Sequence, residues 1–348
     1  MAELVRERDV SSNAYKGGGK RDGSRVAGTV TLSQRPFCLE NGGEIAEVQV
    51  AYEIVGPSDG PVIAVLGGIS ATRYVSAATS GPRGWWADLC GPNLALDTTK
   101  YRLLSWDFLG GNGATTGPRS APDVRESFPD ITTFDQARVA EELLSLLGIK
   151  QLHAFVGASY GGMVALAFAA AYPAKVRQLV AIVTAHRSAP LAIGWRTIQR
   201  QIVQLGLSAD RGDEGLAIAR ALGMSTYRTA DEFSQRFSGG RTEEADPDSF
   251  PVWGYLKSRG DDYVRQMDPY AFLTLSRSID LHEVDPAKIA VPSTLVAVRQ
   301  DQLVPLSLVE ELAANYGAPC ELQVLDSLYG HDGFLKEPTF FSNLFRCL

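Results

Sequence analysis

Cysteine is scarce in this sequence. Only four occur, scattered singly as Cys38, Cys90, Cys320 and Cys347. No two form a CxxC pair, so we expect neither a zinc site nor a disulfide framework, and the isolated thiols favour a reducing compartment. Long apolar runs are missing too. Runs such as residues 62–66 are far short of the roughly 20 residues with which a helix crosses a bilayer.

Excess positive charge is absent as well. The 348 residues include 33 Lys and Arg against 40 Asp and Glu, a net charge of −7, so neither nucleic acid nor an anionic membrane is expected as a partner. We expect no signal peptide at the start of the chain, because residues 1–25 are polar and glycine-rich. We therefore expect a disordered leader over residues 1–25 and a soluble cytoplasmic enzyme.

Short apolar runs bounded by Gly, Pro or Asp alternate with helical patterns from about residue 45. The runs predict strands at 48–54, 62–66, 101–106, 152–156, 178–183, 293–298 and 321–325. Helices are predicted at 134–147, with Thr132 or Thr133 as N-cap, and at 163–172 and 309–316. This alternation predicts an α/β protein with a mostly parallel sheet covered by helices on both faces.

One long segment, residues 188–285, interrupts the alternation. It reads as amphipathic helices, for example at 193–207, 215–222 and 230–237, with a loop at 238–248 and no clear strand. A few extra surface helices would explain it, but its length of nearly 100 residues favours a helical lid inserted between two strands. The predicted core is then 26–187 together with 286–348.

The most informative motif is GASYG at 157–161, between an apolar strand and an alanine-rich helix. A G-x-S-x-G motif in that setting is the nucleophile elbow of an α/β-hydrolase fold. The strained turn holds the hydroxyl of Ser159 above the sheet, and the glycines Gly157 and Gly161 avoid collisions with neighbouring backbone. We therefore predict Ser159 as a catalytic nucleophile.

An elbow serine requires a base and an orienting acid, in the chain order Ser, Asp, His. Of the four histidines, His331 alone follows the last strand; His153 lies in the elbow strand, and His186 and His282 are expected on the surface or in the lid. Asp301 follows the strand at 293–298 and can orient the histidine. Asp326 also ends a strand and is the rival acid.

The oxyanion hole should combine two backbone N–H groups. One belongs to Tyr160, directly after the nucleophile, and the other comes from the loop after an early strand, where Ile69 follows Gly67 and Gly68. An ordinary tight turn is the alternative use of these glycines. Arg73 lies four residues beyond Ile69, so its long side chain could bind a carboxylate at the far end of an acyl group; a surface arginine is the alternative.

Beyond the elbow, several strings resemble the homoserine O-acyltransferase family of the α/β-hydrolase fold over most of the chain from residue 45. They are GWW at 84–86, GP at 91–92, LGGNG at 109–113, TGP at 116–118, FPDIT at 128–132, GASYGGM at 157–163, MSTYR at 224–228 and GHD at 330–332. The sequence departs from the family pattern at Tyr160, where methionine is usual, at Ala158, and in the loop LGGISA at 66–71.

The resemblance implies a ping-pong transfer from acyl-CoA to the hydroxyl of L-homoserine, on the route to methionine, with no cofactor and a homodimer formed through the lid helices. It also implies that Arg200, in the first lid helix, and Asp332 bind the carboxylate and ammonium of the amino acid, with Tyr227 lining the same pocket. Because of Arg73, succinyl-CoA is favoured slightly over acetyl-CoA.

Three other functions stay open at this point. An esterase or thioesterase would use water as acceptor and leave the amino-acid clamp idle. A serine O-acyltransferase differs by one methylene in the acceptor, worth only about 1–3 kcal/mol of discrimination. A non-enzymatic binding protein on the same fold is disfavoured, since such proteins usually lose a member of the triad.

Overall fold

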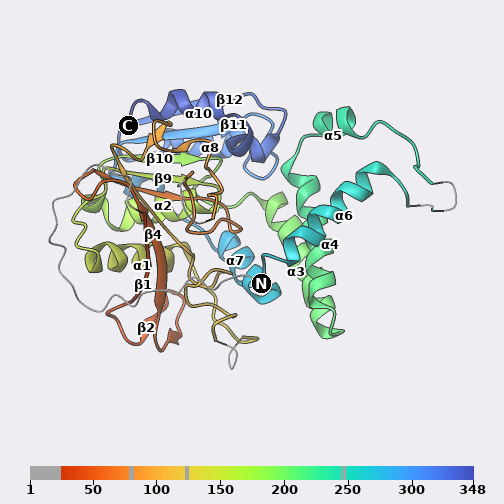
Figure 1. The fold of residues 1–348 in the computed structure, drawn as a ribbon, viewed down its shortest axis with the longest axis horizontal. Coiled ribbons are helices and arrows are strands. Elements are labelled where there is room, and N and C mark those ends of the chain that lie inside the picture. Colours follow the sequence, from red (N-terminus) through yellow and green to blue (C-terminus); the bar gives the residue numbers. More distant parts are fainter. Residues whose placement is uncertain (1–24, 78–81, 122–124, 244–245, 247) are drawn as a thin grey trace.

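An eight-stranded sheet forms the centre of the computed structural model, which describes residues 25–77, 82–121, 125–243, 246 and 248–348 (Figure 1). The strands lie in the order β1-β4-β8-β5-β9-β10-β11-β12, with β1–β4 and β4–β8 antiparallel and the other pairs parallel. Their bounds are β1 Arg25–Thr31, β4 Gln49–Val55, β5 Val62–Leu66, β8 Arg102–Trp106, β9 Ala154–Ala158, β10 Leu179–Ile182, β11 Ser293–Val298 and β12 Cys320–Leu325. Two small sheets pair β2 (Phe37–Cys38) with β3 (Glu44–Ile45) and β6 (Cys90–Gly91) with β7 (Leu96–Asp97).

The predicted α/β-hydrolase fold is confirmed, and each predicted strand is present within two residues of its expected bounds. Sequence reasoning missed β1, an outer antiparallel strand that is partly exposed and therefore lacks a continuous apolar run. Its Gly28 leaves room for the ring of Tyr52 on β4, which a Cβ would approach to 3.0 Å. The predicted disordered leader lies outside the described residues, apart from Arg25, which begins β1.

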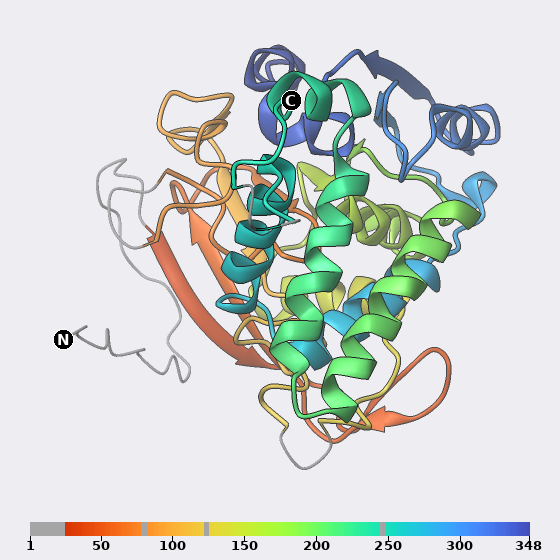
Figure 2. The same cartoon turned by 90° about the vertical axis from the view of Figure 1, so that its right-hand side faces the viewer.

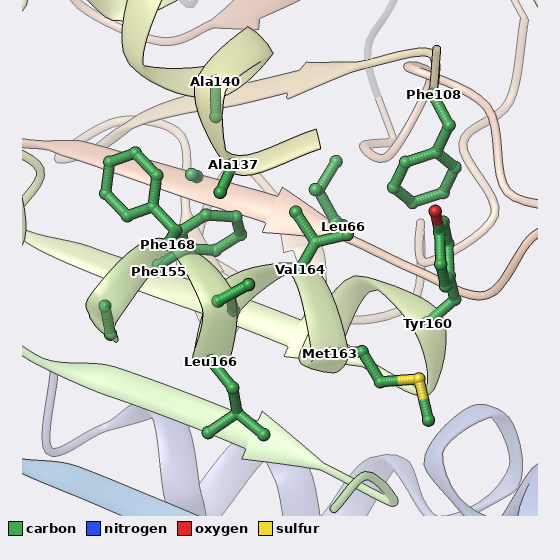
Figure 3. Close-up of a cluster of buried hydrophobic side chains, with 14 of the residues drawn as sticks. Leu66, Phe108, Ala137, Ala140, Phe155, Tyr160, Met163, Val164, Leu166 and Phe168 are labelled. Atoms are coloured by element: carbon green, nitrogen blue, oxygen red, sulfur yellow. The ribbon is translucent and has the colours of Figure 1, made fainter. Parts of the chain in front are cut away.

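Side chains alternate between two apolar layers, one on each face of the sheet. On β5, Ala64 and Leu66 join one layer, whereas Ile63 and Val65 join the other. Helices α1 (Thr133–Leu146), α2 (Tyr160–Ala171) and α8 (Leu306–Ala314) cover the first face; α9 (Gly333–Lys336) and α10 (Pro338–Phe345) cover the second. Figure 3 shows the α2 side chains within the first layer. The buried sheet is thus a rigid base for the loops at its carboxyl edge.

Five helices follow β10 and precede β11, and no strand lies among the described residues between them. They are α3 (Pro190–Ser208), α4 (Gly212–Tyr227), α5 (Ala230–Arg236), α6 (Pro251–Val264) and α7 (Pro269–Asp280), together called the insertion. In the described part of the chain, one-turn 3₁₀ helices also occur at Pro173–Lys175, Pro286–Lys288 and Gly330–Asp332. In Figure 1, α3, α4 and α6 stand away from the sheet, and Figure 2 looks onto them.

The insertion has a small core of its own, which includes Val203, Leu216 and Phe272. Helix α7 also belongs to the main body, because its Leu275 packs in the layer that covers the sheet. A helical insertion is therefore confirmed, while the division at 188–285 into a separate lid stays a prediction. In the described part of the chain, no helix is both long enough and apolar enough to span a membrane.

Candidate active site

Ser159 lies at a sharp turn between β9, which ends at Ala158, and α2, which begins at Tyr160. Its backbone has φ 54° and ψ −120°, a conformation that L-residues rarely adopt. Neighbouring backbone leaves no space for side chains beside it: a Cβ would lie 2.3 Å from Gly161 O at Gly157 and 2.4 Å from Leu66 O at Gly161. The two glycines of the motif are thus required by close packing around a strained serine.

The three predicted triad residues meet in space, although they come from distant parts of the chain. His331 Nε2 lies 2.9 Å from Ser159 Oγ, and His331 Nδ1 lies 2.6 Å from Asp301 Oδ2. The other carboxylate oxygen of Asp301 accepts from the N–H groups of Leu303 and Val304 at 2.8 and 3.0 Å. The acid is therefore fixed in position, and the imidazole can act as base toward the serine.

Asp326, the rival acid, lies elsewhere. Its carboxylate is exposed and accepts from Arg299 Nε at 3.0 Å and Gln300 Nε2 at 3.2 Å. The bond between His331 and Asp301 leaves Asp326 no place in the triad.

His331 is buried, and burial alone lowers the pKa of an imidazole. The charge of Asp301 and its hydrogen bond, with a smaller contribution from Asp332, outweigh burial and raise the pKa of His331 above its usual value. The site therefore favours an imidazolium, the form that appears when the histidine takes the proton of the serine.

Two backbone N–H groups lie free beside the nucleophile. Tyr160 is the first residue of α2, so its N–H has no partner within the helix, and the N–H of Ile69 donates to no acceptor among the residues that the structure describes. Both residues line the same cavity as Ser159. The loop of Ile69 is a turn, closed by Ala71 N–H donating to Gly68 O at 2.8 Å, so the turn and the oxyanion donor coexist there.

A cavity of about 220 Å³ opens over Ser159, between the sheet and the insertion. Besides the serine and His331, it is lined by four of the predicted site residues: Ile69, Tyr160, Tyr227 and Asp332. Apolar side chains make up much of the remaining wall, among them Met163, Phe272 and Leu303. Such a site can hold a small ligand away from bulk water.

The other two predicted binding residues do not line this cavity. Arg200 is an ion-pair partner of Asp280 at 2.7 Å and donates to Ser276 O at 3.1 Å. Arg73 forms a buried ion pair with Asp107 at 2.5 Å and donates to Tyr74 Oη at 2.8 Å. Asp107 neutralises Arg73, and Asp280 holds Arg200 although it shares its charge with Arg196. Because Arg73 and Arg200 are engaged by protein carboxylates and lie away from the cavity wall, neither is placed to bind a substrate carboxylate there.

Sequence reasoning missed Arg220 of α4, which does line the cavity. Its guanidinium lies over the rings of Tyr263 and Tyr227, 4.5 and 5.2 Å from their centroids. Within the described residues no carboxylate is in ion-pair distance of it, and its Nε is buried without a hydrogen-bond partner. A buried cation without an anion is expected to bind a ligand carboxylate. Arg220 lies four residues before Met224, just outside the string MSTYR at 224–228, so its nearness to that string was the available sequence signal.

Asp332 follows the catalytic histidine and faces the same space. One of its oxygens accepts from Arg228 Nε at 2.8 Å. The side chain of Asp332 is 15% exposed, so its carboxylate is held in place but stays open to the cavity. Arg220 and Asp332 thus place a cation and an anion on the wall of the same cavity, the complement of an amino acid.

The remaining histidines have structural environments. His282 is buried, with Nδ1 2.7 Å from Thr133 Oγ1 and Nε2 3.1 Å from Ala185 O. His186 is also buried and precedes residues 188–285, so the expectation of a surface or lid position is wrong for it. His282 lies within residues 188–285 but is buried rather than on the surface. His153 Nε2 lies 2.6 Å from Leu348 O. Among the described residues, no group of His, Cys, Asp or Glu is arranged to hold a metal ion.

Comparison with known proteins shows which proteins this chain is similar to. A family model described as alpha/beta hydrolase fold matches residues 61–338. The chain is 43% identical over 298 residues to a homoserine O-succinyltransferase of Xanthomonas campestris pv. campestris, covering 84% of this chain and 76% of the relative. It is 33% identical to a serine O-succinyltransferase of Frateuria aurantia (87% and 93%) and 34% identical to a homoserine O-acetyltransferase of Thermobifida fusca (88% and 89%).

Among solved structures, a homoserine O-acetyltransferase from Bacillus anthracis superposes with a TM-score of 0.82, covering 92% of this chain and 96% of that one. The sequence identity of 22% makes this a likeness of fold.

Proposed function

Because the chain belongs to the homoserine O-acyltransferase family of the α/β-hydrolase fold, we propose that it transfers a succinyl group from succinyl-CoA to the hydroxyl of L-homoserine, on the route to methionine. One observation carries the choice of an amino acid as acceptor. The cavity that holds Ser159 and His331 also presents an unpaired cation, Arg220, and an accessible carboxylate, Asp332. A plain esterase has no need of that pair.

The first half-reaction forms an acyl-serine. His331 Nε2 takes the proton of Ser159 Oγ as the oxygen attacks the thioester carbon. Charge on the carbonyl oxygen is stabilised by the N–H groups of Ile69 and Tyr160. The tetrahedral intermediate collapses, the C–S bond breaks, and the imidazolium gives its proton to the departing sulfur, so that CoA leaves as a thiol.

The second half-reaction reverses these roles with the amino acid as nucleophile. Arg220 binds its carboxylate and Asp332 its ammonium, which aims the hydroxyl at the acyl carbon on Ser159. His331 takes the proton of that hydroxyl and returns it to Ser159 Oγ when the ester bond to the serine breaks. The enzyme is restored and an O-acyl amino acid is released.

A succinyl donor brings a second carboxylate, which needs its own cation. Arg187 meets this need better than Arg73, because it lines the cavity and its partner at 2.8 Å, Glu311, is 45% exposed. An ion pair at the surface contributes little, about 0–1 kcal/mol, so a substrate can replace Glu311 at low cost. Arg196 also lines the cavity, but it is held by Asp280 in a largely buried pair at 2.6 Å.

Replacing Arg187 by glutamine tests the donor. We expect kcat/KM for succinyl-CoA to fall by the equivalent of about 1.5–3 kcal/mol, the value of a hydrogen bond to a charged group, while acetyl-CoA is affected much less. Arg299→Gln is the matched control, since Arg299 also forms an exposed ion pair, with Asp326, but does not line the cavity. A wild type that prefers acetyl-CoA, or equal losses with both donors, would overturn the succinyl proposal.

The whole function is tested by supplying homoserine or serine with succinyl-CoA or acetyl-CoA in all four combinations. Release of free thiol should be slow without the amino acid and fast with it, and the product should carry the acyl group on the side-chain oxygen. Thiol release that ignores both amino acids would show a thioesterase instead.

L-serine is the second candidate acceptor, since one of the relatives is a serine O-succinyltransferase. The clamp formed by Arg220 and Asp332 suits both amino acids, because they carry the same two charged groups. The four-way assay separates the two through their values of kcat/KM.

A homodimer formed through the insertion is also part of the proposal. Leu191, Ile198 and Leu205 of α3 are 61%, 52% and 67% exposed, and their spacing of seven residues places them on one face of the helix. Helix α4, beside α3 in Figure 2, adds the exposed Ile218. We expect sedimentation to give a dimer for the wild type and a monomer for Ile198→Glu. A monomeric wild type would contradict this surface as a dimer interface.

A further inference from the structure

We propose that the insertion sets the geometry of the oxyanion hole, with Tyr263 of α6 positioning the Ile69 donor and Ser278 of α7 positioning the Tyr160 donor. This inference rests on the part of the proposed function that makes Ser159 the nucleophile and these two N–H groups its oxyanion donors. It assigns Tyr263 and Ser278 as positioning residues, which act on the reaction through backbone groups of the core.

The first contact joins the loop of Ile69 to α6. Ser70, the next residue, donates a hydrogen bond from its hydroxyl to Tyr263 Oη at 3.1 Å. The side chain of Ile69 packs against the core of the insertion, which includes Tyr263 and Phe272. The residue that carries the oxyanion donor is therefore held from the side of the insertion by one apolar contact and one hydrogen bond.

The second contact joins Tyr160 to α7 below the cavity. The side chain of Tyr160 is buried, and its hydroxyl lies 2.7 Å from Ser278 Oγ. Gln136 Nε2 donates to the same hydroxyl at 3.3 Å, so two polar side chains hold this oxygen in place. Phe108 packs edge-on against the ring of Tyr160 at 4.8 Å between centroids, as Figure 3 shows. Ser278 thus fixes the end of the side chain of Tyr160, the residue whose backbone N–H is the second proposed oxyanion donor.

The two donors are also tied to each other, because Gly161 N–H donates to Gly67 O at 2.8 Å. Moving α6 and α7 relative to the sheet would therefore disturb both donors together. The same Tyr263 ring lies under the guanidinium of Arg220, 4.5 Å away, so the cation proposed to bind the amino acid shares a support with the Ile69 loop. An oxyanion hole loses catalytic power when its donors are misplaced by a fraction of an ångström.

The experiment measures cleavage of p-nitrophenyl acetate by Tyr263→Phe, Ser278→Ala and the double variant. Cleavage of this ester requires Ser159 and the oxyanion hole, but neither CoA nor an amino acid. The measurement therefore stays valid even if the proposed function names the wrong acyl donor or acceptor. Turnover is expressed per serine that reacts with a fluorophosphonate label, which removes any effect of inactive protein. If Ser159→Ala cleaves the ester as fast as wild type, the proposed nucleophile itself fails.

We expect kcat to fall about ten-fold in each single variant and further in the double variant, with KM unchanged, because the ground state does not use the oxyanion donors. Tyr270→Phe is the matched control. Its hydroxyl also joins α7 to the core, by donating to Glu126 at 3.2 Å, but neither residue lines the cavity over Ser159. It should stay within two-fold of wild type.

Ser70→Ala breaks the same hydrogen bond to Tyr263 by changing the partner that belongs to the core of the protein. Because Ser70 is exposed, this change is not expected to cause misfolding. Combined with Tyr263→Phe, it should add no further loss of kcat, since both changes break the same bond. Variants of Tyr263 and Ser278 that match Tyr270→Phe, or that raise KM without lowering kcat, would overturn the proposal.

Discussion

Replacement of Arg220 by glutamine is the sharpest test of the amino-acid clamp. The guanidinium lies over two tyrosine rings, at 4.5 and 5.2 Å from their centroids, and has no ion-pair partner in the described part of the chain. Its loss therefore breaks no internal salt bridge. The substrate carboxylate would be left unpaired in a largely apolar cavity, which costs about 2–5 kcal/mol when one partner of a buried charge pair is truncated.

That cost corresponds to a fall of roughly 30-fold to a few thousand-fold in kcat/KM for the amino acid, since about 1.4 kcal/mol is a factor of ten. Acylation of Ser159 precedes amino-acid binding, so the burst of thiol released from acyl-CoA without the amino acid should change little. The assay is a stopped-flow measurement of that burst, followed by steady-state turnover at varied homoserine.

Arg200→Gln is the control for Arg220→Gln. Arg200 belongs to the insertion as well, but it contacts Asp280 and Ser276 and does not line the cavity. We expect its loss to lower the thermal midpoint and to leave KM for the amino acid within a few-fold of wild type. The reasoning is refuted if Arg200→Gln damages amino-acid use more than Arg220→Gln, or if Arg220→Gln slows both half-reactions equally.

Three further predictions follow from the triad. Ser159→Ala should lower turnover at least about a thousand-fold without unfolding the protein, and a circular dichroism melt alongside the assay checks both points. Asp301→Asn should cost on the order of 10⁴ in kcat because the imidazole loses its orienting acceptor, whereas Asp326→Asn should be nearly silent; the reverse order in kcat would reassign the acid. Neutral His331 is the base, so the rate of acylation should rise with pH through the raised pKa of His331. Asp332→Asn removes a nearby negative charge and should therefore move this rise in the pH–rate profile to lower pH. A shift to higher pH would contradict the assignment of His331 as base.

Local features of the sequence were sufficient to predict the strands of the sheet and the nucleophile Ser159. The strands at Val62–Leu66 and Ser293–Val298 agree with their predicted bounds to the residue, because buried parallel strands are short continuous apolar runs. The elbow at Ser159 was predictable because its glycines and flanking elements are adjacent in the chain. Chain order then pointed to His331 and Asp301, whose loops leave the same edge of the sheet.

The tertiary structure alone decided which charged side chains reach the cavity. Arg200 and Arg220 both lie on helices of the insertion. No local pattern says that Asp280, from a helix 80 residues further on, pairs with Arg200 and leaves Arg220 without an ion-pair partner among the described residues. In the same way Asp107 neutralises Arg73, while Arg187 borders the cavity. Binding depends on which charge is left without a partner, and that is fixed by contacts between segments far apart in the chain.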